Sequence, residues 1–315
     1  MARSPLTSSP SRLLALLPPR LKANPLMTLD TLQDFIVAID QAGELVRVRE
    51  PVACRLEIAE IADRCMKSPG GGPALLFEQP LLDDVRPSAF PVAINLFGSL
   101  RRMSLALGVE RLDQIADRIS ELLELKVPDG LLGKLALLPR LAEVAKFPPR
   151  TRSGRPACQE VVWRDQEIDL GRLPFLTTWP QDGGRYITLP MVITTDPASG
   201  IRNVGMYRVQ VQGPRELAMH WQRHKVGAHH WRAMAERGER MPVAIAVGAD
   251  PASVYAASAP LPPTIDEFLF AGFLRRAPVA LARAVGCDLE VPAEAAFVTE
   301  AYIDPAEPLV TKGPF

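Results

Sequence analysis

The sequence predicts an α+β fold, with an N-terminal α/β domain followed by a domain built on a mostly antiparallel sheet or barrel. Two observations support this prediction. Residues 27–145 alternate between stretches with the apolar period of a helix and short apolar stretches typical of strands. Residues 159–315 instead contain β-rich runs between turns with Pro, Gly and Asp. These runs are residues 187–194, 204–211, 243–247 and 297–303.

The first predicted helix extends from Thr31 to Gly43. Thr31 can cap its start together with Asp34, and Gly43 can end it. Its apolar face has the i, i+3, i+4, i+7 spacing and consists of Leu32, Phe35, Ile36 and Ile39. The other elements expected in this region are a strand at 44–48, a helix at 56–66, strands at 74–77 and 91–96, and a helix at 112–125.

Further segments complete the predicted organisation. Residues 146–158 form a polar, Pro-rich linker between the two domains, and helices are expected at about 226–237 and 264–275. Residues 1–26 carry basic residues, serines and prolines but no acid. Such a segment fits a targeting peptide, or a disordered or mis-assigned N-terminal extension. We favour the extension, because the prolines would break an amphipathic helix.

Composition restricts the partners and the location. Lys and Arg total 36 and Asp and Glu total 36, so no excess of positive charge points to a nucleic-acid partner. No uninterrupted run of about 18 apolar residues predicts a membrane span. None of the cysteines belongs to a C-x-x-C pair, so we expect idle thiols in a reducing cytoplasm rather than disulfides or zinc ligands. They are Cys54, Cys65, Cys158 and Cys287.

The chain lacks several motifs that identify large enzyme classes. It contains no G-x-x-x-x-G-K-[ST] loop, no G-x-G-x-x-G unit between a strand and a helix, and no G-x-S-x-G elbow. These absences disfavour a P-loop nucleotide enzyme, a dinucleotide-dependent dehydrogenase and an α/β-hydrolase.

All 4 histidines of the chain lie between positions 220 and 230. Histidine is the commonest metal ligand and titrates near neutrality. The spacing of His220, His224, His229 and His230 matches no zinc motif such as H-E-x-x-H. The pattern therefore allows two interpretations: histidines with a function, or ordinary surface or hydrogen-bonded histidines.

A polar segment around Asn203 combines groups that can bind a ligand. Asn203 offers an oxygen donor, Gly205 allows close approach of the backbone, and Tyr207 and Arg208 could hold an anion. On a strand, Asn203, Gly205 and Tyr207 would share one face. A surface strand with an ordinary exposed arginine has the same pattern and is the default interpretation.

Glu267 has two interpretations. It follows Thr264 by three residues, which is the spacing of a capping box at the start of a helix. Alternatively, its carboxylate could bind a hard cation, because such cations prefer oxygen donors.

Taken together, several segments resemble the UbiD family of prenylated-FMN-dependent decarboxylases. The resemblance extends from about Met27 to Phe315, and the segments are specific as an ordered set. They are residues 72–78, 95–98, 169–174, 203–208, 220–225, 260–272 and 288–292.

The resemblance implies a fold and a reaction. The fold is an N-terminal α/β domain, a flavin reductase-like split β-barrel that binds the flavin, and a C-terminal α/β domain that this sequence lacks. The reaction is non-oxidative decarboxylation with prenylated FMN, whose phosphate is held through Mn²⁺ with K⁺ nearby. The flavin serves as an electron sink while CO₂ leaves, and an acidic residue returns a proton.

The resemblance also assigns roles by motif position. The metal ligands would be Asn203, His224 and Glu267. The flavin-binding residues would be Met206, Tyr207, Arg208, His220, Trp221, Gln222, Lys225 and Val226. Arg208 would also be catalytic, as the arginine of a Glu–Arg–Glu network at the substrate carboxylate, where a guanidinium can pair with two oxygens.

The end of the sequence departs from the family pattern. The family motif reads Glu-Gly-Pro-Phe-Gly followed by an acid, whereas this sequence reads Lys312-Gly-Pro-Phe315 and stops. Lys312 thus replaces the first acid of the network, and the second acid would follow the last residue. We therefore expect a cofactor-binding half-site, and a poor or inactive decarboxylase when the chain is alone.

The resemblance implies substrates and partners as well. The substrate would be a polyprenyl-hydroxybenzoate of ubiquinone synthesis, which we favour, a naphthoate of menaquinone synthesis, or another unsaturated acid. The partners would be a flavin prenyltransferase that supplies the cofactor, further copies in a homo-oligomer, and a membrane surface reached through a lipidic substrate. Two rivals are a non-catalytic or split-enzyme fragment that binds flavin and metal, and an ordinary flavin reductase-like barrel that binds FMN without manganese.

Overall fold

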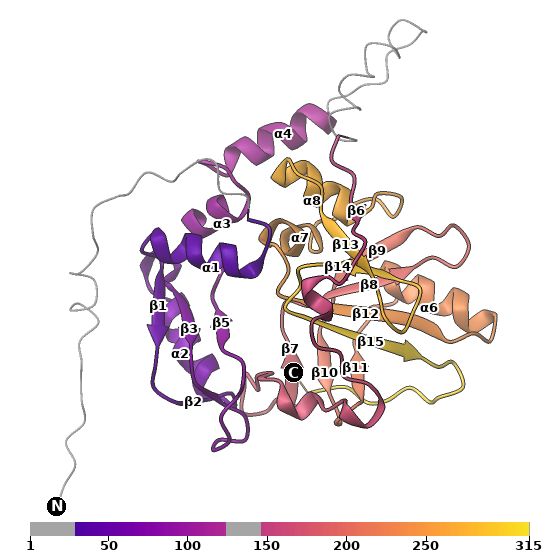
Figure 1. The fold of residues 1–315 in the computed structure, drawn as a ribbon, viewed down its shortest axis with the longest axis horizontal. Helices are drawn as coiled ribbons and strands as arrows, with labels where there is room; N and C mark the ends of the chain where they lie inside the picture. Colours follow the sequence, from indigo (N-terminus) through magenta and orange to yellow (C-terminus); the bar gives the residue numbers. More distant parts are fainter. Residues whose placement is uncertain (1–28, 124–145, 315) are drawn as a thin grey trace, which may run out of the picture.

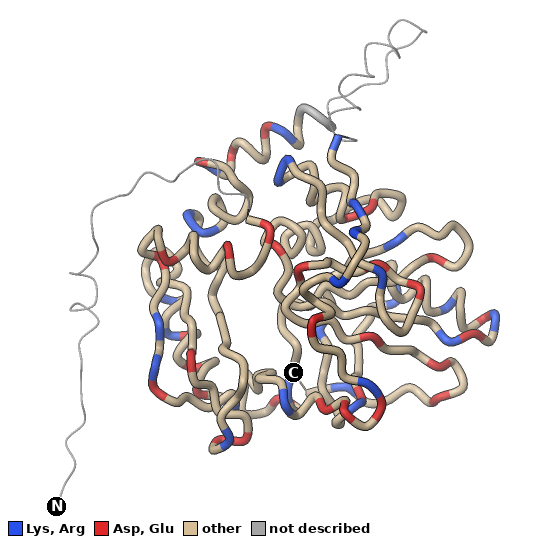
Figure 2. Tube along the Cα trace, viewed as in Figure 1, with Lys and Arg blue, Asp and Glu red and all other residues tan. Residues whose placement is uncertain are grey.

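The computed structural model describes residues 29–123 and 146–314. Figure 1 shows an N-terminal group of helices and strands, in indigo and purple, beside a larger C-terminal group that contains most of the strands. The predicted extension at 1–26 lies outside the described residues, as does the end of the predicted helix at 112–125. No described helix is both long and apolar enough to cross a lipid bilayer. Basic and acidic residues are interspersed along both groups (Figure 2).

The N-terminal group is built on a three-stranded sheet of order β1-β3-β5, in which β1 runs parallel and β5 antiparallel to β3. All residues of β3 are buried, because α1 and α2 contribute to separate apolar clusters that each include residues of this strand. The bounds are α1 (Leu32–Gln41), β1 (Leu45–Val48), β2 (Val52–Ala53), α2 (Glu57–Met66), η3 (Pro69–Gly71), β3 (Ala74–Phe77), β4 (Pro80–Leu81), β5 (Val92–Ile94), α3 (Leu100–Ala106) and α4 (Asp113–Leu123).

The predicted cap of α1 is confirmed. The hydroxyl of Thr31 accepts a hydrogen bond from the backbone N–H of Asp34 at 3.0 Å, and the Asp34 carboxylate accepts one from the backbone N–H of Thr31 at 3.0 Å. Phe35 and Ile39, on the predicted apolar face, are fully buried. The other strands and helices predicted for this group are also present, with slightly shorter bounds.

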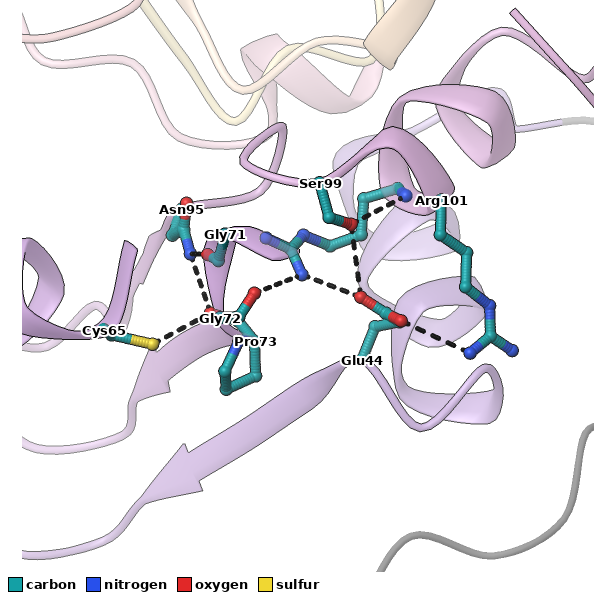
Figure 3. A network of polar contacts seen from close by, with 9 residues as sticks. Glu44, Cys65, Gly71, Gly72, Pro73, Asn95, Ser99 and Arg101 are labelled. Atoms are coloured by element: carbon teal, nitrogen blue, oxygen red, sulfur yellow. Dashed lines mark hydrogen bonds and ion pairs between the residues drawn. The ribbon is translucent and has the colours of Figure 1, made fainter. Parts of the chain in front are cut away.

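A network of polar contacts joins the start of α3 to the glycine-rich turn before β3 (Figure 3). Arg102 is fully buried and donates from Nη1 to the Glu44 carboxylate and to the Gly72 carbonyl, at 2.8 Å each. The amide of Asn95 donates to the carbonyls of Gly71 and Pro73 at 2.8 and 2.9 Å. The glycines of this turn have positive φ angles and make no regular strand pairing of their own. The hydrogen bonds from Arg102 and Asn95 therefore hold the turn in place.

The C-terminal group contains three sheets, of order β15-β12-β8-β9, β11-β10-β7 and β14-β13-β6. Their strands pair antiparallel, except that β6 runs parallel to β13. The bounds are β6 (Arg150–Thr151), η4 (Ala157–Gln159), η5 (Asp165–Glu167), η6 (Leu170–Arg172), β7 (Arg185–Ile187), β8 (Met191–Thr195), β9 (Arg202–Met206), β10 (Val209–Val211), β11 (Leu217–Met219), α6 (Val226–Glu236), β12 (Met241–Val247), α7 (Pro251–Ala256), α8 (Glu267–Arg275), β13 (Ala280–Arg283), β14 (Glu290–Pro292) and β15 (Phe297–Ile303).

The four-stranded sheet forms the middle of this group. Ile193 and Ala244 belong to an apolar cluster with α7 and α8, whereas their neighbours Val192 and Val243 belong to a cluster with α6 and the β11-β10-β7 sheet. Alternate residues therefore face opposite sides of the sheet, as the period of a strand requires. Both faces of the central strands are covered by other elements, which explains why β12 is apolar along its whole length.

Two of the predicted β-rich runs do not form single continuous strands. The run at 187–194 divides into β7 and β8, and the run at 204–211 divides into β9 and β10. In each case the chain passes from one sheet to another, because β7 pairs with β10 while β8 pairs with β9. The first break has a local cause: Pro190 has no N–H to donate, and Leu189 before it has a φ angle of 52°. Both breaks form one corner between the two sheets.

The predicted α+β class is confirmed, and so is the antiparallel character of most strands after residue 159. No sheet among the described residues closes into a barrel. Part of the predicted linker at 146–158 is a strand, because β6 pairs with β13. The two groups meet where the rings of Phe90 and Phe297 contact edge to face, with 4.9 Å between their centres.

Candidate functional site

The start of α8 differs from its predicted cap. Thr264 does not cap this helix; instead Asp266 accepts a hydrogen bond from the backbone N–H of Phe268 at 2.8 Å. Glu267 is therefore the first residue of the helix and completes no capping box. The capping interpretation of Glu267 is wrong, because a shorter turn at Asp266 satisfies the exposed N–H groups of the first turn.

The Glu267 carboxylate lies against β9. It accepts a hydrogen bond from the backbone N–H of Val204 at 2.8 Å, and 9% of the residue is exposed. Burial raises the pKa of this carboxyl to about 7, although the Val204 N–H favours the ionised form. The charge of Arg202 also favours the ionised form, but Arg202 itself pairs with Asp266 and Glu290, so this buried carboxylate suits a further positive ligand.

Asn203 and Tyr207 lie next to this carboxylate. Asn203 is buried, and among the described residues its amide nitrogen has no hydrogen-bond partner. Burial raises the pKa of the Tyr207 phenol, while the neighbouring Asn203 side chain and the Gly227 N–H oppose that shift. The Tyr207 ring folds back over Gly205, where an added Cβ would stand 2.4 Å from it. Glycine at 205 therefore permits the approach of Tyr207 to Asn203.

The first turn of α6 closes the other side. Trp221 packs against Gly227, where an added Cβ would stand 2.9 Å from the indole ring. The rings of Trp221 and Tyr207 contact edge to face at 5.9 Å. Within the described part of the chain, the buried indole N–H of Trp221 has no acceptor. The unpaired donors of Asn203 and Trp221 are therefore available to hydrogen-bond a ligand here.

The structure brings some predicted site residues together and leaves others at the rim. Glu267 contacts β9 at the backbone N–H of Val204, the residue after Asn203, whereas His224 is exposed, and no described hydrogen bond joins it to Asn203 or Glu267. Met206 lies at the end of β9 and donates to the Ala257 carbonyl at 3.0 Å. The remaining predicted flavin residues, His220, Gln222, Lys225 and Val226, lie in the segment between β11 and the first turn of α6.

Arg208 lies at the corner between β9 and β10, with Lys312 nearby. The Lys312 ammonium stands 5.0 Å from the centre of the Tyr186 ring. Burial and the charge of Arg208 both lower the pKa of Lys312. The segment that carries Lys312 is held on β10, because Gln210 accepts from the Gly313 N–H at 3.0 Å. Two cationic side chains therefore share this corner, as the order of the motifs implied.

The donor set fits a hard divalent cation with an anionic ligand. An amide and a carboxylate are the oxygen donors that manganese or magnesium accepts, and the N–H groups at the start of α6 favour an anion such as phosphate. Within residues 29–123 and 146–314, no three His, Cys, Asp or Glu side chains converge on a metal position. A cation site at Glu267 would therefore need an oxygen donor of another kind, which the Asn203 amide offers.

Sequence reasoning missed two contributors to the site. The turn after α7 contacts β9 through the Ala257 carbonyl, and Gly227 provides the space for Trp221. Neither position has a chemically distinctive side chain. The available signals were the turn-forming prolines after Ala257 and a glycine within the predicted first turn of a helix, which is an unfavourable position for it.

Family comparisons match most of the chain. The family model described as the 3-octaprenyl-4-hydroxybenzoate carboxy-lyase Rift-related domain of UbiD matches residues 150–315, and the model of the corresponding N-terminal domain matches residues 36–121. An uncharacterized protein of Aquifex aeolicus is 47% identical over 284 residues. That alignment covers 90% of this chain and 57% of the relative.

Solved structures with the same fold include UbiD-class enzymes and decarboxylases of aromatic acids. The UbiD-class enzyme HmfF from Pelotomaculum thermopropionicum, in complex with FMN, is 28% identical with a TM-score of 0.72, covering 88% of this chain and 55% of its own. The vanillic acid decarboxylase of Sedimentibacter hydroxybenzoicus, in its closed form, is 26% identical with a TM-score of 0.76, covering 91% and 57%. An evolved dimeric form of HmfF was solved in complex with prFMN. It is 28% identical to this chain with a TM-score of 0.72, and the match covers 88% of this chain and 58% of that protein. This chain thus spans little more than half the length of these proteins.

Proposed function

Because the chain belongs to the UbiD family, we propose that it carries the flavin- and metal-binding part of a decarboxylase that acts on an aromatic carboxylic acid. The observation that supports this most is the buried Glu267 carboxylate beside Asn203, whose amide nitrogen has no partner in the described structure. The carboxylate and the amide oxygen suit a divalent cation, whereas the unpaired amide N–H suits an acceptor such as a phosphate oxygen. HmfF and the vanillic acid decarboxylase, which are similar over this region, support the reaction class.

The cofactor proposed is prenylated FMN with Mn²⁺. Asn203, Glu267 and His224 would hold the metal, and the first turn of α6 would contribute to the phosphate end. K⁺ is proposed nearby. When bound, the prenylated flavin supplies the electron sink that loss of CO₂ from an aromatic acid requires. Tyr207 and Trp221 exclude water from this end, since their rings pack edge to face over the two glycines.

Arg208 is proposed to orient the substrate. Its guanidinium can pair with both oxygens of a carboxylate, which fixes the acid for release of CO₂. The other proposed flavin contacts are Met206, His220, Gln222, Lys225 and Val226. Lys312 adds positive charge at the same corner, which favours binding of the anion but supplies no acidic proton donor of the kind in the family motif.

The biological setting is proposed from the family. The favoured substrate is a polyprenyl-hydroxybenzoate of ubiquinone synthesis; a menaquinone-pathway naphthoate or another unsaturated acid is the alternative. A flavin prenyltransferase would supply the cofactor, and the protein would form a homo-oligomer in the cytoplasm. A lipidic substrate would bring it to a membrane surface.

Lys312 favours a second candidate function. A lysine at the position of the first network acid reverses the charge beside Arg208, which suits a fragment that binds flavin and metal without turnover, or one part of a split enzyme. If so, Lys312→Glu restores the family motif and gains turnover when the portion that the relatives have beyond this alignment is supplied. If Lys312→Glu and the wild type turn over equally, the charge reversal has no such consequence.

The test is purification after co-expression with a flavin prenyltransferase. We expect prenylated FMN and Mn²⁺ in equimolar amounts, identified by mass spectrometry, absorbance and metal analysis. CO₂ release is then assayed with hydroxybenzoate and naphthoate acids. Retained cofactor without CO₂ release supports the second candidate. FMN bound without manganese would indicate an ordinary flavin-binding barrel, and protein that retains neither ligand would contradict both candidates.

A further inference from the structure

We propose that Arg202 is a positioning residue that fixes the Glu267 carboxylate for metal binding, by clamping the turn at the start of α8 onto β9. This inference rests on the proposed function. Arg202 does not belong to the predicted ligand set, and it lies one residue before Asn203 in β9.

Arg202 holds two carboxylates from different elements. Its Nη2 stands 2.6 Å from Asp266, and its Nη1 stands 2.8 Å from Glu290 in β14. The Arg202 side chain is 13% exposed, whereas its partners Asp266 and Glu290 are 25% and 38% exposed. The guanidinium also stacks over the Phe268 ring, with 5.1 Å between them. A planar guanidinium with donors in a fixed fork can hold such an arrangement, whereas a lysine holds one point contact.

The clamp acts on the residue next to the proposed ligand. One oxygen of Asp266 caps α8 by accepting from the Phe268 N–H at 2.8 Å, and the other oxygen pairs with Arg202. The position and direction of the first helical residue, Glu267, are thereby tied to β9. The same strand donates the Val204 N–H to Glu267 at 2.8 Å. Arg202 and Val204 are thus two anchors that hold α8 on one strand.

A third element stiffens the clamp. Glu290, the second carboxylate on Arg202, also accepts from the Thr151 hydroxyl of β6. The arginine therefore connects β9 and α8 to the β14-β13-β6 sheet. Groups hydrogen-bonded to metal ligands orient them, and their loss typically lowers metal affinity about 10- to 100-fold. Arg202 acts on Glu267 through the neighbouring Asp266. Without Arg202, the carboxylates of Asp266 and Glu290 would repel each other and the carboxylate of Glu267, the proposed metal ligand.

The experiment measures the dissociation constant of Mn²⁺, from the free-ion electron paramagnetic resonance signal, in the whole purified chain with FMN present. We expect Arg202→Met to weaken Mn²⁺ binding at least tenfold. Arg202→Lys keeps the charge and should recover part of the loss. Asp266→Asn can still cap α8 but weakens the ion pair, so it should also lower the affinity. The effects of Asp266→Asn and Arg202→Met on the Mn²⁺ affinity should not add, because both changes break the same ion pair between Arg202 and Asp266.

Arg47→Met provides a matched control. Arg47 also bridges an aspartate and a glutamate, Asp40 and Glu78, but on the exposed surface of the N-terminal group. Its loss should leave the Mn²⁺ affinity unchanged. If the wild type binds Mn²⁺ and both Arg202→Met and Asp266→Asn bind it equally well, the positioning role is overturned while the proposed function stands. Wild-type protein that binds no Mn²⁺ would overturn the proposed function and this role together.

Discussion

His230 is a buried histidine whose surroundings disfavour its charged form. Its Nδ1 lies 2.9 Å from the Thr194 hydroxyl, between α6 and β8. Burial lowers the pKa of this imidazole. The unfolded chain therefore binds a proton more readily than the folded chain below about pH 6.5, so the free energy of unfolding falls as the pH drops through this range and stops falling below the folded-state pKa.

We predict that His230 makes the protein less stable in acid. Its contribution amounts to at most about 1.4 kcal/mol per pH unit below about pH 6.5. His230→Gln should flatten the dependence of the unfolding free energy on pH between 7.5 and 5.5, measured by urea denaturation. His220→Gln, at an exposed position, should leave that slope as in the wild type. An unchanged slope in His230→Gln would show that this histidine is not responsible.

The histidines also show how far residue-level prediction reaches. Their clustering between 220 and 230 is evident in the sequence, but their separate environments are not. His229 and His230 are consecutive in α6, and the helix turns one to solvent and the other into the core. His224 lies before the helix and is exposed. Only the position of the helix against the sheet decides which imidazole is available to a ligand.

Among the elements, the turn between β5 and α3 depends on Gly98. A Cβ at this position would stand 1.8 Å from the Asn95 side-chain oxygen and 3.1 Å from Arg102 Nη2. Asn95 is buried and holds the carbonyls of Gly71 and Pro73, as Figure 3 shows, so it cannot move aside without breaking those bonds. The space at Gly98 is therefore a requirement of the whole network.

We predict that Gly98→Ala lowers the free energy of unfolding by about 2 kcal/mol, because forced overpacking of a close-packed region has that order of cost. The measurement is thermal or urea unfolding followed by circular dichroism. Gly213→Ala is the matched control, since an added Cβ there meets only the flexible Glu216 side chain, at 3.2 Å. Equal stability of the two variants would mean that the network tolerates displacement of Asn95.

At this scale, the sequence predicted which residues form strands better than where strands change sheets. Runs such as 204–211 are apolar on both sides of Tyr207, and no proline or glycine interrupts the Tyr207–Arg208 step. The break exists because Tyr207 folds over Gly205 and the chain crosses to the next sheet. This is a tertiary effect, and local propensity does not contain it. The cap of α8 is similar: it is Asp266 rather than the predicted Thr264, and Asp266 is held to β9 by Arg202.

In the whole molecule, Arg275 ties the two groups together. It pairs with Asp30, just before α1, and stands 3.3 Å from the fully buried Asp250. These residues line a small polar cavity of about 20 Å³. Burial raises the pKa of Asp250, and the charge of Arg275 opposes that shift. The arginine therefore stabilises a carboxylate that would otherwise be buried alone.

We predict that Arg275→Met lowers the free energy of unfolding by about 3 kcal/mol. This is the typical cost of removing one partner of a buried ion pair and leaving the other charge without compensation. Adding Asp250→Asn should recover part of this loss, because the buried charge is then removed as well. Arg152→Met, which breaks a more exposed pair with Glu294, should cost less than about 1 kcal/mol. Calorimetry on the three variants tests this; no recovery in the double variant would contradict it.

The residues proposed for the cofactor end are local in the fold, so short motifs were enough to propose them together. Asn203, Tyr207 and Glu267 come from β9, the corner after it and α8, all within the C-terminal group. The substrate end could not be predicted in the same way. Arg208 and Lys312 share a corner, but this chain covers only 57% of the Aquifex aeolicus relative, and the substrate's other contacts are not defined by these residues.

The central claim is that Glu267 and Asn203 hold a metal that binds the flavin phosphate. The most direct measurement is the affinity for FMN with and without Mn²⁺, by isothermal titration calorimetry on the wild type, Glu267→Gln and the control Glu294→Gln. We predict that Mn²⁺ strengthens FMN binding at least tenfold in the wild type and the control, and has no effect in Glu267→Gln, because linked ligands raise each other's affinity equally. FMN affinity that is independent of Mn²⁺ in the wild type, or an undiminished effect in Glu267→Gln, would contradict the claim.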